Sequence, residues 1–402
     1  MSTTRLQFHP LTYVEERDGI AVGRADIESY ALLPADGVAL LKQLAGGMPV
    51  PEATNWYQST FGEPVDMDDF VAALHDLGFV RDDGEPPAEP PKVRGRALGR
   101  AAFSPAAWVV YGAVAVAAVL AMALRPELRP RASNVFFVPS LIMVQLVLAL
   151  FQPPVTLFHE WYHLLAARRL GLPSRLTIGR RYYYVVVETH LNALLGVPRR
   201  QRYLPMLAGM LADLLLFGVL VLVAAADPYA GLSLVGRLAL AVAYIIMFRV
   251  AWQFYIFLRT DLYYVLTTAL GCTNLHEVTR AYLRDRFGWL PWVRESDWAS
   301  GDWSPRDRKV APWFALITLG GVGFLAVTIV LWTAPLVVAF GSRIAAAMST
   351  SVTGAGFWDS IGSLLLVGFE LVVMPVIAGR VGRRRAQTGS DQVPSAVPTT
   401  TS

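Results

Sequence analysis

The sequence is poor in charged residues and has almost no cysteine. Asp, Glu, Lys and Arg make up 16% of its 402 residues, whereas an ordinary soluble domain has about 25%. The single cysteine, Cys272, excludes an internal disulfide framework and any zinc site built from several thiolates. The first residues lack the apolar core of a secretory signal peptide. The chain also lacks an internal repeat, a glycine-rich phosphate loop and a nucleic-acid-binding motif, so we expect no nucleic-acid partner.

Apolar residues are abundant instead, and they occur in long runs. They make up 54% of the chain, and the mean hydropathy is +0.43. Several runs hold about 20 or more mainly apolar residues, enough to cross a hydrocarbon core of roughly 30 Å as a helix. Their approximate limits are 105–124, 136–158, 203–225, 232–258, 311–340 and 357–378. The sequence therefore predicts a mainly α-helical, polytopic membrane protein with about six transmembrane helices in a lipid bilayer.

The basic residues are distributed unevenly between the connecting loops. The 164–202 loop carries eight arginines, and the 259–310 loop carries seven arginines and Lys309. The loops of opposite parity are poorer in positive charge. Because cytoplasmic loops are enriched in Lys and Arg, we expect a multi-pass protein of the cell membrane with both termini in the cytoplasm.

Before the first apolar run, the chain has the pattern of a small soluble domain. Residues 12–34 predict two short strands with a turn at Asp18-Gly19, and a helix ends at Gly46-Gly47. The apolar spacing over 66–77 predicts a second, amphipathic helix, and GFVRDD predicts a final strand. We therefore expect a cytosolic α+β domain over 1–83. A Pro/Arg-rich linker over 84–103, a membrane domain over 104–386 and a disordered tail over 387–402 complete the expected organisation.

The chemistry-bearing motif is His159-Glu160-Trp161-Tyr162-His163, at the end of the second apolar run. On a helix, His159 and His163 lie one turn apart on the same face, where their imidazoles can share a Zn²⁺ ion. Glu160 is the expected catalytic residue, a general base on zinc-bound water as in metalloproteases. His and Glu are costly within a membrane span and are usually functional there.

Two histidines leave such a site one protein ligand short. The carboxylate candidates are Glu188, Asp213, Asp261 and Glu370. We favour Asp261 as the third metal ligand because the expected topology places it at the same membrane surface as the histidines. Asp213, inside the third run, has Arg249 as an available partner; it remains a rival ligand or a group behind the ligands. We expect Glu370, midway along the last run, not to be a ligand.

Between the second and third runs, residues 182–187 are β-branched or aromatic and predict a strand. An exposed strand edge beside the motif could bind an extended peptide. Tyr182, Tyr183 and Tyr184 could equally form an aromatic belt at the membrane interface. His190 and Arg259 are the candidates for stabilising an oxyanion; alternatively, His190 is an interfacial residue and Arg259 anchors the fourth span.

These motifs resemble those of the site-2 protease family of intramembrane zinc metalloproteases. That family has H-E-x-x-H in one span, then an A-G-P-x-x-N segment, then an L-D-G-Y-Y-type segment whose Asp is the third ligand. Here HEWYH, AGMLAD at 208–213 and TDLYYVL at 260–266 hold these positions. The chain departs from the pattern at Met210, Asp213 and Leu262. The order of elements over 1–83 resembles the PqqD-like winged-helix domain, which binds peptides in ribosomal-peptide modification systems.

The resemblance implies a membrane-embedded zinc endopeptidase that cleaves a peptide or a membrane-anchored protein segment. It also implies possible partners among peptide-modification or export proteins. The alternative is a non-proteolytic membrane partner of such a system, in which the zinc is structural or absent. A transporter is disfavoured because the chain lacks paired inverted repeats with broken helices.

Overall fold

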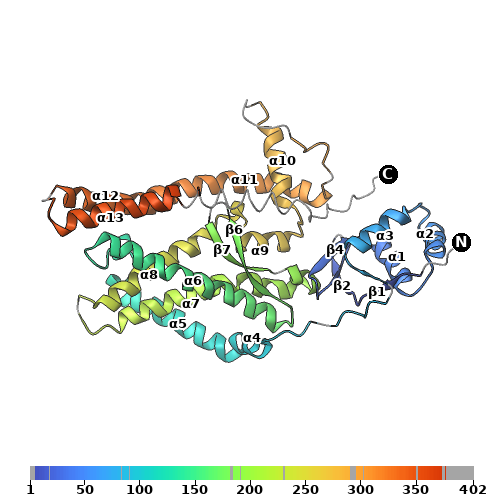
Figure 1. Ribbon diagram of the computed structural model, residues 1–402, viewed down its shortest axis with the longest axis horizontal. Helices are drawn as coiled ribbons and strands as arrows, with labels where there is room; N and C mark the ends of the chain where they lie inside the picture. Colours follow the sequence, from blue (N-terminus) through green and yellow to red (C-terminus); the bar gives the residue numbers. More distant parts are fainter. Residues whose placement is uncertain are drawn as a thin grey trace.

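The computed structural model of the chain describes residues 5–17, 19–82, 84–89, 91–181, 184–190, 192–229, 231–289, 296–301, 303–349, 352–373 and 376. The chain is mainly helical, with a bundle of long helices at one end of the molecule and a small amino-terminal domain at the other (Figure 1). Within these residues, six helices are long and apolar enough to cross a membrane, as the sequence predicts. The expected disordered tail, 387–402, lies outside the described residues.

The amino-terminal domain combines two small antiparallel sheets with three helices. β1 (Gln7–Phe8) pairs with β5 (Val80–Arg81), and β2 (Thr12–Glu16), β3 (Gly19–Arg24) and β4 (Ser29–Leu33) form a meander. The sequence predicted only two strands before the first helix. The third forms because a second turn, with Glu28 in a left-handed conformation at φ 55°, reverses the chain after β3. The predicted turn residue Asp18 lies outside the described residues.

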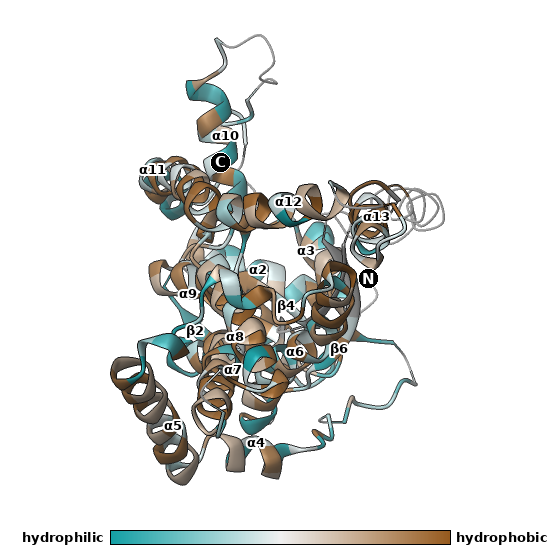
Figure 2. Cartoon of the chain, turned by 90° about the vertical axis from the view of Figure 1, so that its left-hand side faces the viewer, coloured by the Kyte–Doolittle hydropathy of each residue, from teal (hydrophilic) through white to brown (hydrophobic). Residues whose placement is uncertain are grey.

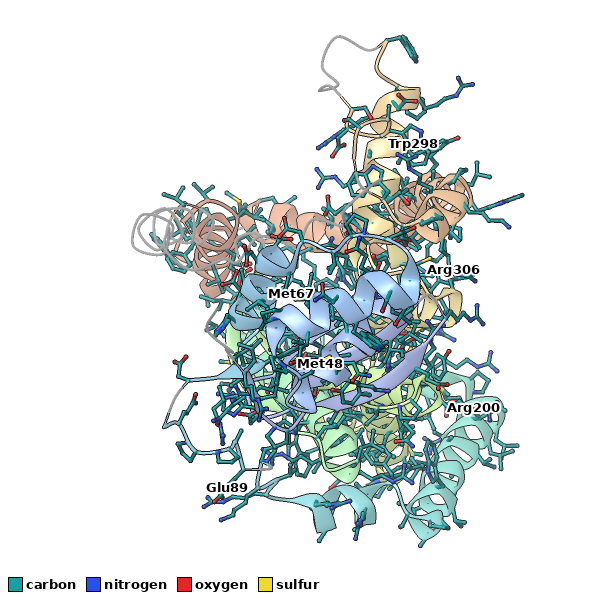
Figure 3. All side chains as sticks on the ribbon, turned by 90° about the vertical axis from the view of Figure 1, so that its right-hand side faces the viewer. Met48, Met67, Glu89, Arg200, Trp298 and Arg306 are labelled. Atoms are coloured by element: carbon teal, nitrogen blue, oxygen red, sulfur yellow. The ribbon has the colours of Figure 1, made fainter. Side chains whose placement is uncertain are left out.

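The helices of this domain cover its apolar core. They are α1 (Ala35–Ala45), α2 (Val50–Phe61) and α3 (Met67–Asp76). The helix predicted to end at Gly46-Gly47 and the helix predicted over 66–77 are confirmed, whereas α2 was not predicted. Val22, Leu41, Leu44 and Phe79 are fully buried between helices and sheet. Figure 3 views the molecule from this end, with Met48 and Met67 of the domain in front of the remaining chain.

The linker predicted over 84–103 is not extended throughout. Its last part forms the short helix α4 (Arg96–Ala102), which packs on the carboxyl end of the second long helix. The prolines stop at Pro91, so the following residues are free to become helical. A Cβ at Gly99 would lie 2.9 Å from the backbone nitrogen of Arg169, which shows how closely the two helices approach.

The long helices carry the predicted spans with shifted limits. They are α5 (Pro105–Leu124), α6 (Leu141–Arg169), α7 (Arg199–Ala225) and α8 (Leu234–Trp252), then α11 (Pro305–Thr328) continuing through the π-helical η5 (Ile329–Thr333) into α12 (Ala334–Met348), and finally α13 (Ala355–Gly368) with the π-helical η6 (Phe369–Val373). Most residues of α12 and α13 are hydrophobic, as their brown colour in Figure 2 shows. Exposed apolar side chains such as Val109, Leu150 and Val338 are typical of helices that face lipid.

Shorter elements connect the spans and position the residues considered below. They are the 3₁₀ turns η1 (Pro126–Leu128), η2 (Ala132–Val135), η3 (Asn192–Gly196) and η4 (Ile256–Leu258), the helices α9 (Asp261–Leu270) and α10 (Leu275–Arg286), and the hairpin of β6 (Arg175–Arg181) and β7 (Tyr184–His190). The hairpin pairs in antiparallel register from Arg175 opposite His190 to Arg181 opposite Tyr184. A strand in the predicted 182–187 segment is therefore confirmed for its described part.

Candidate metal centre

Two histidines of α6 lie side by side on its buried face. His159 and His163 are 5% and 3% exposed, and their Nε2 atoms are 3.2 Å apart. The i, i+4 spacing brings the rings together because α6 continues as a helix through the motif to Arg169. The expected helical conformation of this motif is thus confirmed.

Asp261 reaches the same point from another part of the chain. Its Oδ2 lies 3.3 Å from His159 Nε2 and 3.4 Å from His163 Nε2. The residue begins α9 directly after a tight turn in which Arg259 is left-handed, at φ 58°. Gln253 holds this turn, since its side-chain oxygen accepts from the Asp261 backbone N–H at 3.0 Å and its carbonyl accepts from Thr260 Oγ1 at 2.7 Å.

The other nitrogen of each histidine ring has an acceptor as its partner. His159 Nδ1 lies 2.9 Å from Asp213 Oδ2, and His163 Nδ1 lies 2.7 Å from the carbonyl oxygen of Pro205. A carboxylate and a carbonyl can only accept, so both Nδ1 atoms carry the proton and donate. In the neutral rings, the two Nε2 atoms then present lone pairs toward the Asp261 carboxylate.

Gly209 of α7 makes room for this arrangement. A Cβ at this position would lie 2.6 Å from His159 Cδ2 and closer still to the Nε2 atoms of both histidines. Ala208 and Ala212 beside it are fully buried against α6. Small residues in an apolar helix permit such close helix approach, so α7 can pass directly across the two rings.

Asp213, also on α7, lies behind His159 and is fully buried. Its second oxygen, Oδ1, is 3.5 Å from Arg249 Nε, and Arg249 Nη1 donates to Thr156 Oγ1 at 3.0 Å. The guanidinium on α8 thereby balances the charge of a carboxylate that orients a histidine. Thr156 lies on α6, one turn before His159, so this chain of contacts begins and ends on the same helix.

Glu160 is held by the β6–β7 hairpin. Its Oε2 accepts from the backbone N–H of Thr189 and from Thr189 Oγ1, both at 2.9 Å. Among the described residues no hydrogen bond engages its other oxygen, Oε1. The Glu160 side chain, next to the two histidines, is therefore fixed through Oε2, and Oε1 remains available as an acceptor.

The remaining candidates lie outside this cluster or outside the described side chains. Arg259 donates to Glu277 Oε1 at 2.9 Å, and its side chain is exposed. Glu370, on η6 of the last span, is exposed and lies outside the cluster, as expected. The side chains of His190 and Glu188 are not among those described.

Sequence reasoning did not single out Gly209 or Thr189. A signal for Gly209 was present, since it stands among small residues, Ala208 and Ala212, within an otherwise large-residue apolar run. Thr189 carried no signal, because its partner Glu160 is 29 residues earlier and only the hairpin brings the two together.

The three side chains of His159, His163 and Asp261 offer ligand atoms that all lie within 4.8 Å of one another. Two imidazole nitrogens and a carboxylate oxygen are donors that suit a divalent transition metal. Asp261 Oδ2 is buried and has no hydrogen-bond partner among the described residues. No protein-family model, curated protein or solved structure matches the chain.

Proposed function

We propose that the chain is a membrane-embedded zinc endopeptidase, similar to the site-2 protease family. The observation that carries the proposal is the convergence of three lone-pair donors beside Glu160. Ligands at ~2.0–2.1 Å from a tetrahedral zinc ion stand about 3.3–3.4 Å from one another. The three separations here are 3.2, 3.3 and 3.4 Å, so the donor set fits zinc without rearrangement.

The roles of the side chains follow from their contacts. A bound zinc ion would supply Lewis-acid polarisation of the scissile carbonyl and acidify water. Glu160, through its unengaged oxygen, would accept the proton of the attacking water and return it to the leaving amine. Asp213 would keep His159 in the tautomer that presents Nε2 to the ion, with Arg249 compensating its charge. The oxyanion stabiliser is not assigned, since Arg259 is engaged by Glu277.

The setting supports an intramembrane substrate. The histidines stand on α6, one of six helices with the length and apolarity of a membrane span. The hairpin, η3 and the amino-terminal domain gather at the same end of this helix (Figure 1). The arginine-rich loops support cytoplasmic termini. The PqqD-like domain would recruit a peptide or a membrane-anchored segment for cleavage at the cytoplasmic surface, in peptide maturation or export.

The first prediction tests metal and base together. Metal-washed protein in detergent should retain about one zinc per chain by elemental analysis, and chelation should stop cleavage of fluorescently labelled casein until zinc is restored. Glu160→Gln should keep the zinc and lose on the order of 10²–10⁴-fold in rate, because only the proton acceptor is removed. Glu127→Gln, an exposed change beyond α5, is the control. Protein without zinc would refute the proposal, and zinc without cleavage in any preparation would favour the non-proteolytic partner.

The second prediction concerns the residue behind His159. Asp213→Ala should lower zinc affinity or cleavage roughly 10- to 100-fold without emptying the site, as is typical when a group orienting a ligand histidine is lost. Asp213→Asn keeps an acceptor oxygen beside Nδ1 and should lose less. Titration with a competing chelator gives the affinity. Equal losses in both variants would mean that the charge, not the hydrogen bond, matters.

A further inference from the structure

The strand that holds Glu160 is followed in the chain by the 3₁₀ turn η3, which packs against the carboxyl end of α6. Thr189 lies next to the last residue of β7, and η3 begins at Asn192. Ala193 and Leu194 of η3 are buried against Ala167 and Leu172, just beyond the carboxyl end of the motif. Because β7 ends at His190 and η3 begins at Asn192, anything that holds η3 also restrains the end of the strand that carries Thr189.

Arg202 of α7 holds η3 and the amino-terminal domain at once. Its guanidinium donates to the carbonyl oxygens of Val197 at 2.8 Å and Leu195 at 3.3 Å. It also pairs with Glu16 of β2, which pairs in addition with Arg199. The side chains of Arg202 and Glu16 are only 6% and 8% exposed. One buried guanidinium thus joins a strand of the soluble domain to the end of η3.

A second contact reinforces the first. The Tyr30 hydroxyl of β4 lies 2.8 Å from the position that a Cβ would occupy at Gly196, the last residue of η3. Burial, with the nearby charges of Glu28 and Asp26, raises the pKa of Tyr30 to about 12. Strands β2, β3 and β4 all contact η3.

We propose that Thr189 is a positioning residue for Glu160, and that the amino-terminal domain fixes it through Glu16, Arg202 and η3. The catalytic part of this inference rests on the proposed peptidase function. Docking of the domain keeps the end of β7 against α6, and Thr189 then keeps Glu160 in the orientation from which it can transfer a proton. An event that releases the domain would release the general base as well.

The structural part is tested without reference to activity. Hydrogen exchange by mass spectrometry is measured on the full chain in detergent for Glu16→Gln and for Glu15→Gln. Glu15 is the exposed neighbour of Glu16 on β2, so the control makes the same charge change on the opposite face of the strand. Glu16→Gln should accelerate exchange over 189–197, and Glu15→Gln should leave it unchanged. If Glu16→Gln accelerates exchange in β2–β4 but not over 189–197, the coupling is refuted even if the chain proves to be no peptidase.

The catalytic part uses casein cleavage and zinc content. Thr189→Val, which removes the hydroxyl and keeps the backbone donor, should lower kcat about 10-fold with KM and zinc content unchanged, because a hydrogen bond to a charged group is lost. Thr189→Ser should restore kcat. Glu16→Gln should lower kcat in the same way but add little in the Thr189→Val background, since both act on one contact. A rise in kcat in Glu16→Gln, or full additivity of the two changes, would overturn the proposal.

Discussion

Asp261→Ala is expected to empty the metal centre and abolish casein cleavage. The substitution removes the only carboxylate among the three converging donors and leaves two imidazole nitrogens 3.2 Å apart. A zinc ion held by two protein ligands in place of three loses both affinity and the fixed geometry that activates water. The loss should exceed the ~10–100-fold expected for Asp213→Ala. Zinc per chain and cleavage rate, measured side by side for both variants, give the answer.

The comparison is informative because the two aspartates contact opposite nitrogens of the same ring. Asp261 lies at Nε2 of His159 and Asp213 at Nδ1. Asp261→Ala does not touch the buried pair with Arg249, so the fold of the bundle should persist and the melting temperature should stay close to that of the metal-free parent. If Asp213→Ala lost zinc while Asp261→Ala kept it and still cleaved, the two assignments would be exchanged, and the resemblance to the site-2 protease family would fail at its third ligand.

Gly209→Ala is expected to destroy the metal centre by adding a single methyl group. Ordinary contact with a Cβ begins at 3.4 Å, whereas this Cβ would meet His159 Cδ2 at 2.6 Å and both Nε2 atoms at shorter range. The rings or the α6–α7 crossing must therefore shift by about 1 Å, and a zinc site tolerates only about 0.2 Å in its ligand distances. Overpacking of this kind also costs roughly 1–3 kcal/mol of stability.

Gly112→Ala is the matched control for that experiment. Gly112 lies in the neighbouring span α5, and a Cβ there meets nothing within 4 Å. The same change should leave zinc content unaltered and stabilise the helix by up to ~1 kcal/mol, because alanine is the better helix former. Full zinc occupancy in Gly209→Ala would show that the two helices lie farther apart than the structure has them.

The long elements of the fold could be predicted from local composition. In a lipid environment, apolar runs such as 105–124 and 203–225 can hydrogen-bond their backbone N–H and C=O groups only as helices. The length of these runs was therefore enough to predict that they are helical. The helix ends did not follow from apolar composition: the helix that contains the predicted run 311–340 extends from Pro305 to Met348. Helix α4 within the expected linker was missed because it packs on the distant helix α6, and strand β4 was missed because the turn at Glu28 was not predicted.

The sequence by itself determined the His159-Glu160-xx-His163 pair, since an i, i+4 spacing on a helix places two rings on one face whatever surrounds them. It also narrowed the third ligand to a few carboxylates. Only the tertiary structure decided which carboxylate faces which nitrogen, because α7 and the turn before α9 must cross α6 to bring Asp213 and Asp261 to opposite sides of one imidazole. It alone placed Gly209 against the rings, Thr189 against Glu160 and Glu16 against Arg202. These contacts join residues 29 to 186 positions apart, a separation at which local sequence pattern carries no information about proximity.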